Sequence, residues 1–364
     1  MSKRRDIIKL IIKALILSAG CLIFICLFNF IIDPLQFYRK ATLYTPTFYG
    51  QQRYQNPGFA RNYDYNTVVV GTSMAENFSN KLIKEKLGLN SIRLTISGSS
   101  AREQYLILNT AMKTGKVKNV IWEVDYYSMG GKVYGVRDQN AKFPFYFYDG
   151  NILNDYKYLI DSNTTRLSVL GIIKSLSGSV KSIDYQLDNY CRWGVWASPS
   201  DYGKDKVYKN FLERLKNGEF QKSAYNYQLY SWDVIKGNLD INIIPFMLKN
   251  RDVKFYLYFP PYSILGQKAF YLQDVLKTEL EYKKYMIERV GKLSNVKIYD
   301  FQNAKDIIYN LDNYKDKSHH KMEVNDYIID CMAENKYNVK DMDLNNEYEQ
   351  FTKDVAAYDI YKNQ

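Results

Sequence analysis

The sequence has few of the residues that build disulfide scaffolds, zinc sites and imidazole chemistry. Its four cysteines are scattered along the chain, at Cys21, Cys26, Cys191 and Cys331. Four cysteines in 364 residues exclude a disulfide framework, and their scatter excludes a cysteine-based zinc site. The only two histidines are adjacent, His319 and His320, so any imidazole base must be one of them. Neighbouring side chains point in different directions, which argues against a metal site on this pair.

Charge is absent from residues 14–32, and this absence predicts a transmembrane anchor. Nineteen helical residues cross the hydrocarbon core at about 1.5 Å per residue. Residues 1–13 carry a net charge of +4, which favours a cytoplasmic N-terminus and an extracytoplasmic C-terminal domain at the cell membrane. A cleaved signal peptide and a lipidated Cys21 are alternatives. The apolar run is long for a signal peptide, has no A-x-A site after it, and continues past Cys21.

The rest of the formal charge of +11, a net +7 from Asp33 onward, lies in the outer part. A basic outer domain fits an anionic wall polymer or lipid headgroups, and it fits general solubility equally well. The chain has no dense basic cluster, so we expect no nucleic-acid partner.

Beyond residue 64, β-rich runs alternate with helical patterns. The expected strands are residues 65–71, 92–97, 119–125, 254–260 and 296–301, and the expected helices are residues 75–87, 102–113, 272–293 and 324–335. Apolar strands separated by helices indicate a parallel sheet covered on both faces. The sequence therefore predicts an α/β fold, with a doubly wound, flavodoxin-like, five-stranded parallel sheet.

Composition divides this outer part further. Residues 33–64 have no clear period and are predicted to be a membrane-proximal linker; residues 65–338 form the α/β domain, and residues 339–364 a polar tail. Residues 130–250 interrupt the alternation and are expected to form an inserted lobe. The lobe is rich in aromatic residues, including 143–148, Trp193, Trp196, Tyr225, Tyr227, Tyr230 and Trp232. Most of them are expected to form its core, and some could stack on sugar faces.

Three sequence features fall at the carboxyl ends of the predicted strands, where parallel sheets carry their sites. Ser73 follows the first strand in a Gly-Thr-Ser turn, and Gly98 follows the second. Asp316 stands three residues before His319, after the fifth strand. An acid that orients a histidine, which in turn reaches a serine, is the arrangement of a nucleophile, a base and an orienting acid.

Ordinary helix capping is the competing interpretation of the serines. Ser73 with Glu76, and Ser100 with Glu103, both fit the S-x-x-E capping box. The location of the chain's only histidines at the same predicted sheet edge favours the catalytic hypothesis for Ser73.

The order Gly-x-Ser, Gly and Asp-x-x-His resembles the SGNH (GDSL-like) hydrolase superfamily. The segments GTSMAENF (71–78), VIWEVDYYS (120–128), YFPPYS (258–263) and NYKDKSHH (313–320) resemble a membrane-anchored bacterial branch. That branch is related to the DltD protein of teichoic-acid D-alanylation and to SGNH proteins of polysaccharide O-acetylation. The resemblance covers residues 68–329.

The resemblance implies Ser73 as nucleophile, His319 as general base and Asp316 as its orienting acid. The backbone N–H groups of Ser73 and Gly98 would form the oxyanion hole. The superfamily's Gly-x-Asn-Asp block is absent, and Val-Asp125-Tyr-Tyr occupies its place. Asp125 is thus either a substrate-binding residue or a structural acceptor of loop N–H groups. His320 is expected to be a packing or rim residue.

Two functions follow. The first is an extracytoplasmic serine esterase or O-acyltransferase acting on a cell-envelope glycopolymer, without metal or organic cofactor. The second is a non-catalytic binding or scaffolding partner of a multi-span membrane acyltransferase or polymer-export complex, which the missing Asn donor favours.

Overall fold

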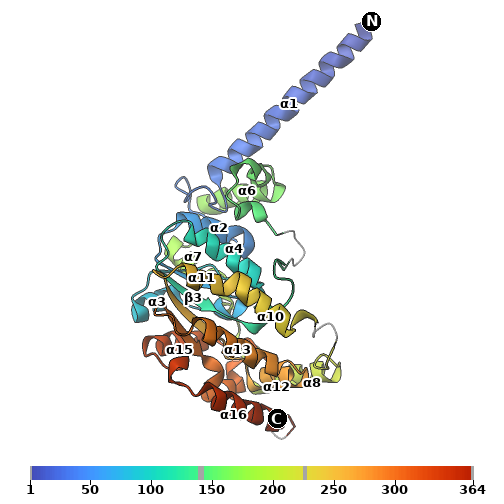
Figure 1. Ribbon diagram of the computed structural model, residues 1–364. Helices are drawn as coiled ribbons and strands as arrows, with labels where there is room; N and C mark the ends of the chain where they lie inside the picture. Colours follow the sequence, from blue (N-terminus) through green and yellow to red (C-terminus); the bar gives the residue numbers. More distant parts are fainter. Residues whose placement is uncertain (1, 138–142, 224–227, 362–364) are drawn as a thin grey trace. The chain divides into compact units, whose positions relative to one another are not determined.

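The computed structural model describes residues 2–137, 143–223 and 228–361 (Figure 1). Tyr225 and Tyr227, expected in the aromatic lobe, lie outside the described residues. The chain divides into two compact units. The first comprises Met1–Tyr63 and Pro144–Gln186, and the second comprises Asp64–Phe143 and Leu187–Gln364. The segment expected as an inserted lobe is therefore shared between the two units.

The first unit begins with the helix that the uncharged run predicted. Helix α1 (Ser2–Ile32) is long and apolar enough to cross a membrane over Lys3–Ile32, with a mean hydropathy of 2.7 in its 18-residue apolar window. Only 11% of that window is buried. Exposed Leu, Ile and Phe side chains along the helix suit a lipid environment. The N-terminal apolar helix is confirmed.

The last turn of α1 is tied to two further helices of this unit, α5 (Tyr156–Leu159) and α6 (Ser162–Leu176), as Figure 1 shows for α6. Asn29, a polar interruption of the apolar run, is fully buried there. Its Nδ2 donates to Leu159 O at 2.7 Å and to Thr165 Oγ1 at 2.8 Å, and its Oδ1 accepts from Ser168 Oγ at 2.9 Å. The buried amide is therefore satisfied on both sides.

Residues 33–64, expected as a linker, contain an ordered helix, α2 (Gln52–Asn62). Phe59 and Ala60 of α2 are buried, and Gln55 Nε2 donates to Leu35 O at 2.8 Å. Short helical segments η3 (Phe145–Phe147) and η4 (Ile152–Asn154) complete the described helices before α5. Phe147 packs edge-on against Phe37 at a ring-centroid distance of 4.7 Å.

The second unit is built on a five-stranded parallel sheet. Its strands are β1 (Thr67–Val70), β2 (Ser91–Arg93), β3 (Asn119–Glu123), β4 (Lys254–Phe259) and β5 (Val296–Asp300). Their order is β2-β1-β3-β4-β5, and every neighbouring pair is parallel. The predicted α/β class and all five strands are confirmed. Parallel strands place their carboxyl ends at one edge, so the loops after β1, β3 and β5 can meet there.

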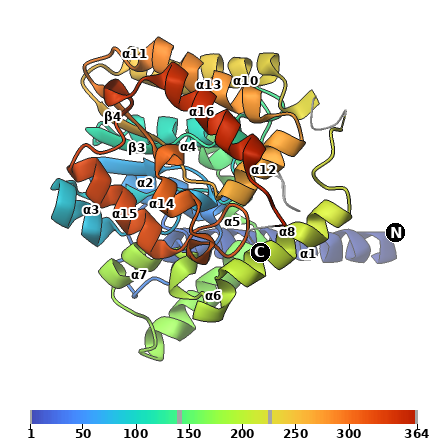
Figure 2. The ribbon, with the colours of Figure 1, turned by 90° about the horizontal axis from the view of Figure 1, so that it is seen from below.

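The strands pack against helices through alternating side chains. Ile121 belongs to a buried cluster that includes Ile83 of α3 (Asn80–Leu87) and Ile328 of α15 (Met322–Ala333). The next residue, Trp122, donates from Nε1 to Gln104 Oε1 at 2.8 Å and packs edge-on against Phe246. Those partners lie in α4 (Ala101–Met112) and α11 (Ile244–Lys249). Figure 2 shows α3 and α15 on one side of β3 and β4, and α11 and α13 on the other.

Further α-helices lie within the described residues. They are α7 (Ile183–Asn189), α8 (Lys204–Lys216), α10 (Trp232–Asn238), α12 (Ile264–Leu272), α13 (Leu276–Val290), α14 (Lys305–Ile308) and α16 (Leu344–Ala357). A π-helical turn, η7 (Leu239–Ile243), joins α10 to α11. Helix α16 lies within residues 339–364, expected as a polar tail, and contacts α12 and α13. Its residue Tyr348 is buried, with Lys283 Nζ of α13 5.6 Å from the ring centroid.

Candidate active site

The serine after β1 lies on a tight turn whose cap is the preceding residue. Ser73 begins a single 3-10 turn, η1 (Ser73–Ala75), and Thr72 Oγ1 accepts from Met74 N at 3.3 Å. The capping interpretation of Ser73 is therefore wrong, and the helix expected at residue 75 begins only at Asn80. Ser100 and Glu103, by contrast, form the predicted capping box at the start of α4. The hydroxyl of Ser73 remains free for another contact.

That contact is a histidine 246 residues away in the chain. Ser73 Oγ lies 2.9 Å from His319 Nε2, and His319 Nδ1 lies 2.8 Å from Asp316 Oδ2. A carboxylate can only accept, so the proton on the ring stands on Nδ1, and Nε2 accepts the hydroxyl hydrogen of Ser73. The three residues expected to act together are thus joined by two hydrogen bonds.

Asp316 is held by its own loop as well as by the histidine. Its Oδ1 accepts from the backbone N–H groups of Ser318 and His319, each at 2.8 Å. These bonds and His319 lower the pKa of Asp316 well below its usual range, although partial burial acts in the opposite direction. The carboxylate therefore stays ionised and fixes both the tautomer and the orientation of the ring.

Trp193 contacts both the serine turn and the histidine. Its Nε1–H donates to Ser73 O at 2.9 Å, and its ring stands edge-on to His319 with centroids 5.8 Å apart. The ammonium of Lys315 lies 4.1 Å from the Trp193 ring centroid. Sequence reasoning missed this role, because Trp193 appeared there only as one aromatic residue of the lobe. No local signal links it to a serine 120 residues earlier.

Gly98 lies at the tip of the turn that follows β2. Ile96 N donates to Gly71 O at 3.0 Å, so this turn runs beside the Ser73 turn. The φ angle of Gly98 is 59°, a left-handed conformation that glycine adopts without strain. Within the described part of the chain, neither Ser73 N–H nor Gly98 N–H has a hydrogen-bond partner. Among the described residues both N–H groups are therefore unengaged, and the resemblance implies them as the donors to a developing oxyanion.

The end of β3 holds two buried carboxyl groups. Glu123 is fully buried; its Oε2 accepts from Thr72 N at 2.7 Å, and its Oε1 lies 2.9 Å from Thr72 Oγ1. The same hydroxyl lies 3.3 Å from Asp125 Oδ2. A Cβ at Gly71 would lie 2.6 Å from Glu123 Cβ, so a glycine here leaves the room that the Glu123 side chain occupies beneath the turn.

One hydroxyl hydrogen cannot be donated to two carboxylates. Burial raises the pKa of Glu123 well above its usual value, and nearby Asp125 raises it further. A protonated Glu123 satisfies both contacts, since its own hydrogen is donated to Thr72 Oγ1 and the threonine hydrogen goes to Asp125. Asp125 also accepts from Tyr127 N at 3.1 Å and from the Tyr262 hydroxyl. The hydrogen bond from Tyr127 N is the kind of contact expected if Asp125 has a structural role as an acceptor of loop N–H groups.

The second histidine is buried and is not part of the hydrogen-bonded chain of Ser73, His319 and Asp316. His320 is 1% exposed and stands edge-on to Tyr314. Its Nδ1 donates to Lys321 O at 3.2 Å, and burial lowers its pKa to about 4. It is therefore a neutral packing residue, as expected. Within the described residues, no group of three or more His, Cys, Asp or Glu side chains could hold a metal ion.

The sequence was compared with protein-family models and with curated proteins. No family model matches the sequence, and no curated protein matches it.

Proposed function

We propose that the protein is a membrane-anchored, extracytoplasmic serine esterase or O-acyltransferase. It acts on a cell-envelope polysaccharide or a teichoic-acid-type polymer through an acyl-serine intermediate. The observation that carries this proposal is the hydrogen-bonded chain from Ser73 Oγ through His319 to Asp316. The resemblance to SGNH hydrolases supports it. The strand order, with helices packed against alternate residues of β3, also suits their doubly wound sheet.

The geometry suggests a two-step reaction. His319 Nε2 takes the hydroxyl proton as Ser73 Oγ attacks the acyl carbonyl carbon, and Asp316 stabilises the resulting imidazolium. The N–H groups of Ser73 and Gly98 stabilise the oxyanion, and His319 returns the proton to the leaving alcohol. Water or a sugar or polyol hydroxyl then releases the acyl group from Ser73 by the same steps.

Labelling with a fluorophosphonate tests the nucleophile. Full-length protein in detergent is expected to react, and labelling should be abolished in Ser73→Ala and strongly slowed in His319→Ala. Ser200→Ala, at an exposed serine of the same unit, is the matched control and should label like the wild type. Absence of both labelling and acetyl-ester turnover in the wild type would refute the enzymatic function.

A second function is favoured by the end of β3. The segment Val-Asp125-Tyr-Tyr stands where the superfamily carries its Gly-x-Asn-Asp block, and loss of one oxyanion donor costs about 10²–10³ in rate. In this alternative the protein binds or scaffolds a multi-span membrane acyltransferase or a polymer-export complex. Co-purification with such a protein, unchanged in Ser73→Ala and without fluorophosphonate labelling, would favour it.

The proposed orientation has its own test. Positive charge before the apolar helix favours a cytoplasmic N-terminus. A cysteine introduced at the exposed Ser200 is expected to react with a membrane-impermeant maleimide in intact cells. One introduced at Ser2 should react only after lysis.

A further inference from the structure

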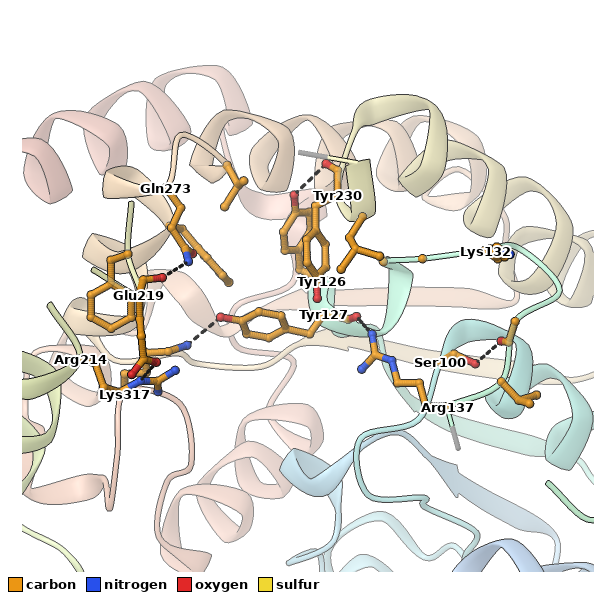
Figure 3. Close-up of a pocket in the computed structure, with 18 residues that line it drawn as sticks. Ser100, Tyr126, Tyr127, Lys132, Arg137, Arg214, Glu219, Tyr230, Gln273 and Lys317 are labelled. Atoms are coloured by element: carbon orange, nitrogen blue, oxygen red, sulfur yellow. Dashed lines mark hydrogen bonds and ion pairs between the residues drawn. The ribbon is translucent and has the colours of Figure 1, made fainter. Parts of the chain in front are cut away.

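A cavity of ≈ 770 Å³ lies in the second unit, next to the candidate active site (Figure 3). Two of its walls are shared with that site. Lys317 stands two residues before His319, and Arg137 donates to Gly98 O at 3.3 Å and to Tyr127 O. A ligand in the cavity would therefore contact the loops that carry the base and the oxyanion turn.

The charge of the lining is unbalanced. Four basic side chains face one carboxylate, namely Lys132, Arg137, Arg214 and Lys317 against Glu219. The carboxylate is already engaged, because Glu219 Oε2 lies 2.7 Å from Arg214 Nε. Within the described residues, Lys132, Arg137 and Lys317 form no ion pair with a carboxylate. Positive charge therefore exceeds negative charge in the lining of the cavity, although the nearby Asp316 and Asp125 favour the charge of Lys317.

Lys317 is the most constrained of these cations. Its Nζ donates to the Tyr127 hydroxyl at 2.7 Å and lies 4.9 Å from the centroid of the same ring. Burial, with a contribution from nearby Arg214, lowers the pKa of Lys317 to about 8. An ammonium with no carboxylate partner in such surroundings is stabilised when an anion occupies the space beside it.

Aromatic rings form another part of the wall. Tyr126 and Tyr230 are stacked with centroids 5.5 Å apart, and Phe270 stands edge-on to Tyr126. Figure 3 shows Lys317 and Arg137 reaching Tyr127 from opposite sides. Such rings pack well on the C–H groups of a polyol or sugar. A purely apolar ligand would leave the cations desolvated without partners, which is costly.

We propose that this cavity binds an anionic segment of the polymer on which Ser73 acts: a phosphate or carboxylate carried on a polyol or sugar chain. This inference rests on the proposed function and narrows its substrate class. The basic side chains bind the phosphate or carboxylate, and the aromatic rings pack on the carbon skeleton. The neighbouring hydroxyl of the polymer, which carries the acyl group, is then presented to Ser73.

Binding is measured apart from catalysis, on full-length Ser73→Ala protein in a non-ionic detergent. Calorimetric titrations use sn-glycerol 3-phosphate and D-galacturonate as anionic probes, with glycerol and D-galactose as their neutral counterparts. We expect the anions to bind and the neutral probes not to bind. The tighter of the two anions identifies phosphate or carboxylate as the group recognised. Increasing salt should weaken binding.

Charge-neutral variants locate the binding. Added to the Ser73→Ala protein, Lys317→Gln should raise the Kd about tenfold, and Lys132→Gln, at an exposed side chain, about threefold. Lys209→Gln, at an exposed lysine on the same helix as Arg214, is the matched control and should leave the Kd unchanged. Thermal unfolding of each variant checks that it is folded.

The inference is overturned if neither anion binds, if the neutral probes bind equally well, or if both lysine variants bind like the control. These outcomes are separate from the test of the proposed function. If the fluorophosphonate labels Ser73 but no anion binds, the esterase function is supported and the anionic substrate is refuted. If an anion binds but Ser73 is not labelled, the enzymatic function is refuted and the cavity is a binding site only.

Discussion

Asp316 and the carboxyl pair Glu123 and Asp125 all lie within a few hydrogen bonds of Ser73, but their surroundings are opposite. Asp316 is about one-third exposed and accepts from two backbone N–H groups and a histidine, so its pKa falls. Glu123 and Asp125 are buried with no cation in an ion pair among the described residues, and burial raises both pKa values. The surroundings of each carboxyl group, rather than its residue type, therefore decide whether its pKa is lowered or raised.

The largest expected effect comes from removing the charge of Asp316. In Asp316→Asn the amide no longer fixes the proton on His319 Nδ1, so Nε2 ceases to be a reliable acceptor for Ser73. We expect kcat for p-nitrophenyl acetate to fall about 10³–10⁴-fold. Asp252→Asn, at an exposed aspartate in the same unit, is the control and should keep full activity. Equal rates in the two variants would contradict an orienting role for Asp316.

The buried pair is tested by stability. Glu123→Ala removes the acceptor of Thr72 N–H and leaves a cavity beneath the serine turn, so we expect a loss of about 2–4 kcal/mol in the free energy of unfolding. Glu123→Gln keeps the shape and a neutral group, and should change that free energy by about 1 kcal/mol or less. Urea denaturation measures both. A large loss in Glu123→Gln would mean that the native carboxyl is ionised.

The pH dependence of stability should have opposite signs in the two regions. A raised pKa means that Glu123 contributes stability below its unfolded value of 4.5 and loses it as pH rises. The stability of Glu123→Gln relative to the wild type should therefore increase between about pH 5 and pH 8. The lowered pKa of Asp316 predicts the reverse, a contribution present above 3.8 and lost on acidification. Denaturation curves measured from about pH 2 to pH 8, with Asp252→Asn as reference, distinguish the two.

A smaller effect is expected from the indole that spans the serine turn and the histidine. Trp193→Phe keeps a ring beside His319 but removes the hydrogen bond to Ser73 O, and we expect kcat to fall about tenfold because the nucleophile is less well placed. Trp196→Phe is the matched control, since Trp196 is 76% exposed. Unchanged kcat in Trp193→Phe would show that the hydrogen bond does not position Ser73.

The smallest effect concerns the lysine next to Asp316. The pKa of Lys317, lowered to about 8, means that its charge is lost as pH rises through that value. Arg214 opposes its charge, whereas Asp316, Asp125 and Glu219 favour it. Affinity for sn-glycerol 3-phosphate should fall several-fold between about pH 7 and pH 9 in the Ser73→Ala background. In Lys317→Gln this dependence should disappear, and its persistence would assign it to another group.

Local sequence patterns predicted much of the architecture. Continuous apolar runs marked the five strands, and the uncharged run marked α1, because strand burial and membrane solvation act on consecutive residues. The capping box of Ser100 and Glu103 was predicted correctly, because such a box depends only on two residues three positions apart in the sequence. The same local rule failed at Ser73, where Thr72 supplies the cap and the hydroxyl is engaged by His319.

The sequence by itself determined which residue types stand at the carboxyl ends of the strands: a serine, a glycine, a carboxyl pair and the chain's only histidines. Only the tertiary structure decided how they pair. It brought Ser73 within 2.9 Å of a histidine 246 residues away, turned Glu123 and Asp125 inward, added Trp193 and formed the cationic cavity. The physical reason is that burial and long-range hydrogen bonds, which set these pKa values and contacts, arise only when distant segments pack together.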